Sequence, residues 1–161
     1  DLGLAGVGCR LGVVAVGAVG DVADGLLAAV GGGGRVSVAV VVDVCLRKDW
    51  ECDGQQATLA LDCGRHQVLS FEEFLLDGMD MLRIVTIVGP VADLSEIQLN
   101  AVLGLNRSLA YGALAIAGDE LVMVDTFLLQ GDCHDLLASA MAFIAETADR
   151  YEREIYHTDI H

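Results

Sequence analysis

Residues 93–156 show the clearest pattern in the chain and read DLSEIQLNAVLGLNRSLAYGALAIAGDELVMVDTFLLQGDCHDLLASAMAFIAETADRYEREIY. The order of apolar, charged and turn-forming residues predicts a capped helix, a two-stranded hairpin and a long amphipathic helix. The segment contains no recognisable reaction centre. It therefore indicates an architecture and a class of protein rather than the process that the protein serves.

The first helix of this segment is predicted from its N-terminal cap. Asp93 and Glu96 have the spacing of a capping box, in which two side chains three residues apart bind each other's backbone amides. We expect the helix to begin there, just after Pro90, and to end before Gly112. Its apolar positions recur every three or four residues and are Leu94, Ile97, Ala101, Leu105 and Leu109.

The hairpin and the closing helix follow from equally local signals. Two apolar segments, 113–117 and 121–129, flank Gly118 and Asp119, which both tolerate the positive φ of a tight turn. Both alternating faces of the second segment are apolar, so it is expected inside a sheet. Asp132 is predicted to cap the closing helix. The apolar stripe of this helix consists of Leu137, Ala140, Met141, Ile144, Ala148, Tyr151 and Ile155, with the charge pairs Glu146/Arg150 and Asp149/Arg153 outside it.

The N-terminal part of the chain is rich in glycine, alanine and valine. Residues 13–30 keep a helical spacing of apolar side chains, which predicts an amphipathic helix that the glycine run 31–34 ends. The valine-rich residues 35–46 predict a strand that is buried on both faces. Further strands are expected at 58–63, at 67–74 as its continuation or its partner, and at 81–88.

Together these elements predict one α+β domain. Their order is helix, three strands, helix, two-stranded hairpin and helix, with the helices packed against a mostly antiparallel sheet. A chain of 161 residues is long enough to bury a core of its own. Residues 1–34 are expected to form a glycine-rich N-terminal segment, and residues 35–161 the α+β domain.

The charge of the chain limits its partners. Nine Lys and Arg residues oppose 24 Asp and Glu residues, which gives a net charge of −15. Because the basic residues are scattered, they suggest no phosphate-binding surface, and we expect neither nucleic acid nor an anionic membrane as a partner. A basic or apolar segment of another protein suits this charge better.

The cysteines and the apolar runs favour a cytoplasmic protein. Five cysteines, an odd number without CxxC spacing, indicate reduced thiols. They are Cys9, Cys45, Cys52, Cys63 and Cys133. The longest uncharged apolar runs, 11–20 and 36–42, are shorter than the roughly 20 residues of a membrane-spanning helix. No basic segment precedes an apolar one as in a signal peptide.

Motifs for cofactors and catalysis are incomplete. The glycines around Gly6 and in the run 31–34 lack the residues that complete a nucleotide-binding loop, so no cofactor is expected. A GxSxG pattern is absent from the sequence, and the adjacent Glu72 and Glu73 point to opposite faces of a strand. We therefore predict no catalytic residue and no enzyme activity.

Two short groups of residues could have a chemical role in place of a structural one. His157 and His161, one helical turn apart, suit a shared metal ion, but a solvated chain end is the simpler explanation. Cys133 and His134 suit a reactive thiol at a helix N-terminus, although first-turn helix residues explain them as well.

Asp125 lies within an otherwise apolar strand. A buried carboxylate must be paired or hydrogen-bonded. Arg83 or Arg107 could be the ion-pair partner of this carboxylate. The alternatives are a structural ion pair or an edge position that faces water.

Three segments of the chain are similar to a known family: LNRSLAYGALAI at 105–116, LVMVDT at 121–126 and AETADRYE at 145–152. With the predicted strands before them they cover about residues 35–156. The order of elements and these segments resemble the type III secretion chaperone-like superfamily. That superfamily includes the Tir-chaperone-type secretion chaperones and the YbjN-like bacterial proteins.

The resemblance implies a homodimer without a cofactor that holds an extended segment of a client protein. It implies a dimer interface on the helix after Pro90, at Leu94, Ile97, Ala101, Leu105 and Leu109. It implies client contacts on the first helix and the first strand, at Val16, Val19, Leu26, Val38, Val40 and Val42.

The leading hypothesis is therefore an acidic, cytoplasmic and non-enzymatic binding protein. One alternative keeps the same fold but acts as a YbjN-like regulator without an export client. A second alternative is a metal or thiol enzyme built on His134, His157, His161 and Cys133, which predicts bound metal in the purified protein.

Overall fold

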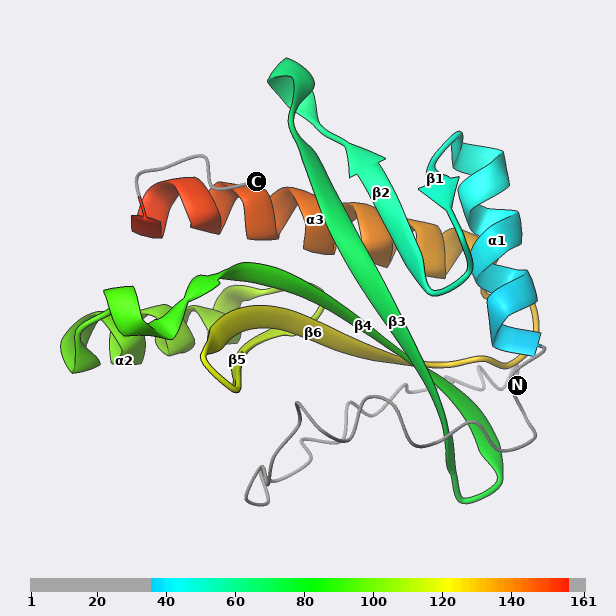
Figure 1. Cartoon of the computed structure of the whole chain (residues 1–161). Coiled ribbons are helices and arrows are strands. Elements are labelled where there is room, and N and C mark those ends of the chain that lie inside the picture. Colours follow the sequence, from blue (N-terminus) through cyan, green and yellow to red (C-terminus); the bar gives the residue numbers. More distant parts are fainter. Residues whose placement is uncertain (1–35, 157–161) are drawn as a thin grey trace, which may run out of the picture.

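The computed structural model describes residues 36–156 (Figure 1). The helix predicted at 13–30 and the paired His157 and His161 lie outside these residues. The described helices are α1 (Val36–Lys48), α2 (Glu96–Gly104) and α3 (His134–Tyr156). The strands are β1 (Glu51–Cys52), β2 (Gln56–Ala60), β3 (His66–Leu76), β4 (Met79–Pro90), β5 (Ala113–Ala117) and β6 (Glu120–Leu128). The short 3₁₀ turns are η1 (Asp62–Gly64), η2 (Val91–Asp93) and η3 (Leu105–Ser108).

The six strands form one antiparallel sheet in the order β1-β2-β3-β4-β6-β5. Helices α1 and α3 pack against one face of this sheet, whereas α2 lies beside β5 at the far end of the molecule from α1 (Figure 1). We call the face that α3 covers the inner face and the opposite one the outer face. The predicted class, α+β with helices against an antiparallel sheet, is confirmed.

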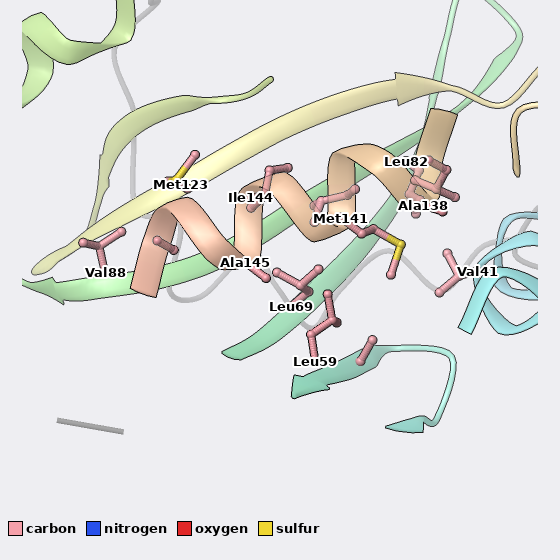
Figure 2. Packing of buried hydrophobic residues seen from close by; sticks show 14 of the residues in the cluster. Val41, Leu59, Leu69, Leu82, Val88, Met123, Ala138, Met141, Ile144 and Ala145 are labelled. Carbon is pink, nitrogen blue, oxygen red and sulfur yellow. The ribbon is translucent and has the colours of Figure 1, made fainter. Parts of the chain in front are cut away.

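The core lies between α3 and the inner face. Met141 and Ile144 of α3 are fully buried in one apolar cluster with Leu59 and Leu69 of the sheet (Figure 2). The predicted stripe of α3 is confirmed, because its residues are buried and only Ile155 remains partly accessible. Each fully buried large apolar side chain contributes about 1.5–3 kcal/mol, so this contact contributes a large share of the stability.

The strand predicted at 35–46 is wrong, because residues 36–46 belong to the helix α1. Valine disfavours a helix by only roughly 0.5 kcal/mol per residue. Val41, Val44 and Cys45 lie at helical spacing and are buried in the core, and this burial outweighs the local preference. Within the described residues the chain therefore begins with the helix α1 where the first strand was predicted, and the strands before α2 are β1 to β4.

The other predicted strands are confirmed with shifted bounds. Residues 58–63 overlap β2, residues 67–74 form the separate strand β3, and residues 81–88 lie within β4. Strand β1 was not predicted, since its two residues are too few to show an alternating pattern.

Tyr156 closes the end of α3 against a bulge in β4. The pairing of β4 with β6 shifts between Ile87 and Gly89. Gly89 has a φ of +156°, and a Cβ there would lie 2.5 Å from the Cε2 atom of Tyr156. The Tyr156 hydroxyl donates to the carbonyl oxygen of Pro90 at 3.1 Å. Burial, with a smaller effect of neighbouring carboxylates, raises the pKa of Tyr156 to about 12.

Helix α2 begins later and ends earlier than predicted. Its N-cap is Ser95, whose hydroxyl accepts from the Gln98 amide while the Gln98 side chain accepts from the Ser95 amide. Asp93 lies in η2 instead, so the predicted Asp93 cap is wrong. The helix ends at Gly104, where η3 begins, and does not continue to Leu109.

The predicted hairpin is confirmed. Strands β5 and β6 are joined by the two-residue loop Gly118-Asp119, and Gly118 has a φ of +60°. Strand β6 lies between β4 and β5, as expected for a strand with two apolar faces. Asp132 lies just before α3, and its carboxylate accepts from the backbone of His134.

Candidate protein-binding surfaces

The outward side of α2 presents an isolated large apolar side chain. Ile97 is 83% exposed, and Ala101 and Gly104 on the same side are exposed as well. We call these three residues the α2 surface. The remaining predicted interface residues, Leu94, Leu105 and Leu109, pack against the core instead. They lie outside α2, which begins at Glu96 and ends at Gly104, so the helical stripe does not include them.

Helix α1 contains three of the valines that were predicted to contact a client. Val38, Val40 and Val42 are partly buried and belong to a helix, so the predicted client-binding strand is wrong. Leu46 near the end of α1 is a large apolar side chain that is 75% exposed. Nearby, Arg47 pairs with Asp43 at 2.6 Å. The predicted client residues Val16, Val19 and Leu26 lie outside residues 36–156.

The outer face of the sheet presents a second apolar surface, at the end of the β3-β4 hairpin. The strand pairing places Leu76 opposite Met79 and Phe74 opposite Met81, with Leu128 opposite Met81 on the other side. Leu76 is 49% exposed, and Met79 and Leu128 are each 39% exposed. We call these five residues the hairpin patch.

A polar row separates this patch from the middle of the outer face. Arg83 lies opposite Glu72 on one side and Thr126 on the other. Its guanidinium donates to the Glu72 carboxylate at 2.7 Å and lies 4.7 Å from the centre of the Phe74 ring. Beyond this row β4 presents Val85 and Ile87 on the same face, and Ile87 is 44% exposed.

One edge of the sheet is closed by a side chain. Strand β5 is an edge strand, and the paired positions along it leave the backbone groups of Leu114 directed away from β6. The Asn106 amide donates to the Leu114 carbonyl at 3.0 Å and accepts from the Leu114 amide at 2.6 Å. Asn106 thus occupies the position that another strand would take. The opposite edge is the two-residue strand β1.

An ion pair joins α3 to the start of β3. The Arg65 guanidinium donates twice to the Asp149 carboxylate, at 2.6 and 2.9 Å, and Arg153 approaches the same carboxylate at 3.1 Å. The predicted Asp149/Arg153 pair is therefore present, but Asp149 is only 6% exposed. Its hydrogen bonds with Arg65 hold the pKa of Asp149 below its usual value.

Asp125 has neither of its predicted arginine partners. It faces the inner side of the sheet, opposite Ile84, whereas Arg83 faces the outer side. Its carboxylate accepts from the Thr126 amide at 2.8 Å and from the Gly112 backbone. Burial raises the pKa of Asp125 in spite of these bonds. The Asp125 carboxylate therefore fixes the backbone at Gly112, in the segment that connects η3 to β5.

The candidate chemical groups occupy structural positions. The ring of His134 lies between the carboxylates of Asp132 at 2.8 Å and Asp43 at 3.2 Å, which joins α3 to α1. The hydrogen bond with His134 lowers the pKa of Asp132. Cys133 is a free, half-buried thiol. Within residues 36–156, His, Cys, Asp and Glu side chains form no group of three suited to a metal ion.

Two adjacent helices, a six-stranded antiparallel sheet and a third helix inserted between β4 and β5 define a type III secretion chaperone-like fold, as the sequence resemblance predicted. A chain in the crystal structure of the ExsC-ExsE complex is similar, with a TM-score of 0.50 and 14% identity, over 72% of this chain and 90% of that chain. A chain in the HopA1-SchA chaperone-effector complex has a TM-score of 0.49 and 13% identity, over 74% and 98%.

These similarities are found in structure alone. No protein-family model matches the chain, and no curated protein matches it. Among residues 36–156, the structure contains no helix that is both long and apolar enough to cross a membrane.

Proposed function

We propose that this protein is a non-enzymatic, chaperone-like binding protein that acts as a homodimer and holds an apolar or extended segment of a client protein. The observation that supports this most directly is the set of large apolar side chains that the folded chain leaves exposed on regular helices and strands. The similar ExsC-ExsE structure is itself a complex of two proteins. The proposal assigns no catalytic residue, cofactor or metal.

The α2 surface is the proposed dimer interface. Ile97 is the most exposed of the large apolar side chains. The small residues Ala101 and Gly104 beside it allow a partner helix to approach closely. A two-fold axis through this surface would place each Ile97 against the other copy, as an isologous interface requires.

The client is proposed to be held on the outer face of the sheet and at its β1 edge, with help from α1. An extended segment can pair with a free strand edge while its alternate side chains enter apolar patches. Because Asn106 closes the β5 edge, the β1 edge is the more open of the two. The net charge of −15 favours a client segment with basic residues beside its apolar ones.

The dimer is tested with Ile97→Glu in the full chain, measured by light scattering. The expected result is a monomer, because a charge replaces the most exposed apolar side chain of the interface. Leu46→Glu is the matched control, since Leu46 is also a highly exposed helical side chain, at 75%, but lies on α1. A dimer that survives Ile97→Glu and is lost with Leu46→Glu would move the interface to α1.

The client is tested by purification from the native cell, with partners identified by mass spectrometry. An abundant partner that binds through an extended apolar segment is expected. A folded partner, or none, would instead favour the YbjN-like regulatory alternative. Metal analysis of the same sample tests the remaining enzyme alternative at His157 and His161.

A further inference from the structure

Two cysteines meet where α1 turns into the edge strand β1. The last turn of α1 ends in a Schellman motif: the Trp50 amide donates to the Cys45 carbonyl at 2.9 Å, and the Asp49 amide to the Leu46 carbonyl at 3.5 Å. Asp49 has the positive φ, 58°, that this motif needs. The chain therefore reverses direction and brings Cys52 back beside Cys45.

The two thiols are in contact but have different surroundings. The Cys45 side chain is 1% exposed, and its thiol is hydrogen-bonded to that of Cys52. Burial first, and then this contact, raises the pKa of Cys45 to about 12. The Cys52 sulfur accepts a hydrogen bond from the Gly54 amide at 3.3 Å.

Cys52 is also the more accessible of the two. It lines a shallow surface depression with Glu51, Asp53, Gln56 and Thr58. A small reagent can reach its sulfur from this depression, whereas Cys45 is buried and does not line it. The arrangement has the order of an attacking thiol at the surface and a resolving thiol behind it.

We propose that Cys45 and Cys52 are a thiol oxidation site that forms a reversible disulfide with a low-molecular-weight disulfide, such as oxidised glutathione, as the oxidant. The Cys52 thiolate attacks one sulfur of the oxidant, whose S–S bond breaks and releases the first glutathione thiol. Cys45 then attacks the Cys52 sulfur, its proton passes to the departing glutathione sulfur, and the second glutathione leaves as a thiol. The two protein thiols are oxidised and one glutathione disulfide is reduced to two thiols.

The bond would change how firmly the sheet edge is held. Strand β1 pairs with β2 only at Glu51↔Thr58 and Cys52↔Ala57. A covalent link from Cys52 to the buried Cys45 would fix this edge to α1, whereas the reduced edge can open. The proposal does not depend on the proposed binding function, because it concerns a bond within one chain.

The test is performed on the full chain with a Cys63→Ser substitution. Oxidised and reduced glutathione are mixed at several ratios, free thiols are blocked with an alkylating reagent, and the protein is digested with trypsin. Arg47 and Lys48 separate the two cysteines, so a disulfide joins the tryptic peptides 36–47 and 49–65. The substitution leaves Cys52 as the only cysteine of the second peptide.

The expected result is a linked peptide pair whose fraction rises with the share of oxidised glutathione and disappears with dithiothreitol. Trp50, the single tryptophan of the chain, lies between the two cysteines, so its fluorescence should fall on oxidation. Cys45→Ser should abolish both signals, and Cys133→Ser should preserve both. A chain that stays reduced at these two positions, or that links either one to Cys9 or Cys133, would overturn the proposal.

Discussion

The ion pair between Arg65 and Asp149 allows a quantitative test of the fold. Asp149→Asn keeps the size of the side chain but removes the carboxylate charge that faces two arginines. Removing one partner of a buried pair costs about 3–5 kcal/mol. The Arg65 side chain is 19% exposed and therefore partly hydrated, so we expect the lower end, about 3 kcal/mol.

Urea unfolding measures this cost. With an m-value of about 2 kcal/mol per M for a domain of this size, a loss of about 3 kcal/mol lowers the unfolding midpoint by about 1.5 M. Glu72→Gln is the matched control, because the Arg83–Glu72 pair has a similar distance, 2.7 Å, but side chains that are 38% and 47% exposed. The loss of this exposed pair should lower the free energy of unfolding by no more than about 1 kcal/mol.

The dependence on pH adds a second criterion. The folded pKa of Asp149 is lowered, so its contribution is fully present above the unfolded pKa, which is about 4, and is lost as pH falls through the folded value. The difference between the parent chain and Asp149→Asn should therefore shrink below pH ~4. Equal costs for the Asp149 and Glu72 substitutions, or a difference that grows in acid, would refute this reasoning.

Two further substitutions test the edge and the bulge. Asn106→Ala removes both hydrogen bonds to Leu114, so it should lower the free energy of unfolding by about 1–3 kcal/mol. It should also cause concentration-dependent association in light scattering, because the β5 edge becomes free to pair. Asn100→Ala, which changes an exposed residue of α2, should have neither effect. Gly89→Ala places a methyl group against the ring of Tyr156, so it should lower the free energy of unfolding by about 1–3 kcal/mol. An unchanged thermal midpoint for Gly89→Ala would show that the ring moves without cost.

The hairpin and α3 were predictable because their signals are local. The turn at Gly118-Asp119 can be recognised without knowledge of the rest of the fold, and a stripe of seven apolar residues determines which side of α3 is buried. The segment 35–46 was not predictable in this way, since a run of valines suits both a buried strand and a buried helix. Only the contact of Val41 and Val44 with the core distinguishes the two.

The cap of α2 shows how two overlapping signals compete. Ser95 and Gln98 have the same spacing as Asp93 and Glu96, and a hydroxyl with Gln at the third position is itself a capping box. The sequence therefore contained the correct cap. The turn η2 determines which of the two caps forms, because Asp93 is part of this turn and therefore lies before the helix begins.

The candidate surfaces were the least predictable part of the protein. The hairpin patch depends on the register of three strands, which the sequence does not specify. The contact of Cys45 with Cys52 depends on α1 being a helix. The missed signal was the alternation along β3, where Phe74 and Leu76 share one face.

The polar row of Glu72, Arg83 and Thr126 sets a spacing for any chain that lies along the outer face. Met81 and Val85 flank this row on β4, four residues apart, which corresponds to about 13 Å along a strand. An extended guest would match the face with apolar residues at every fourth position and a hydrogen-bonding residue midway between them. A guest helix would need about nine residues to cover the same length, since it rises 1.5 Å per residue. A face of this kind would therefore distinguish guests by the interval between their apolar residues as well as by their composition.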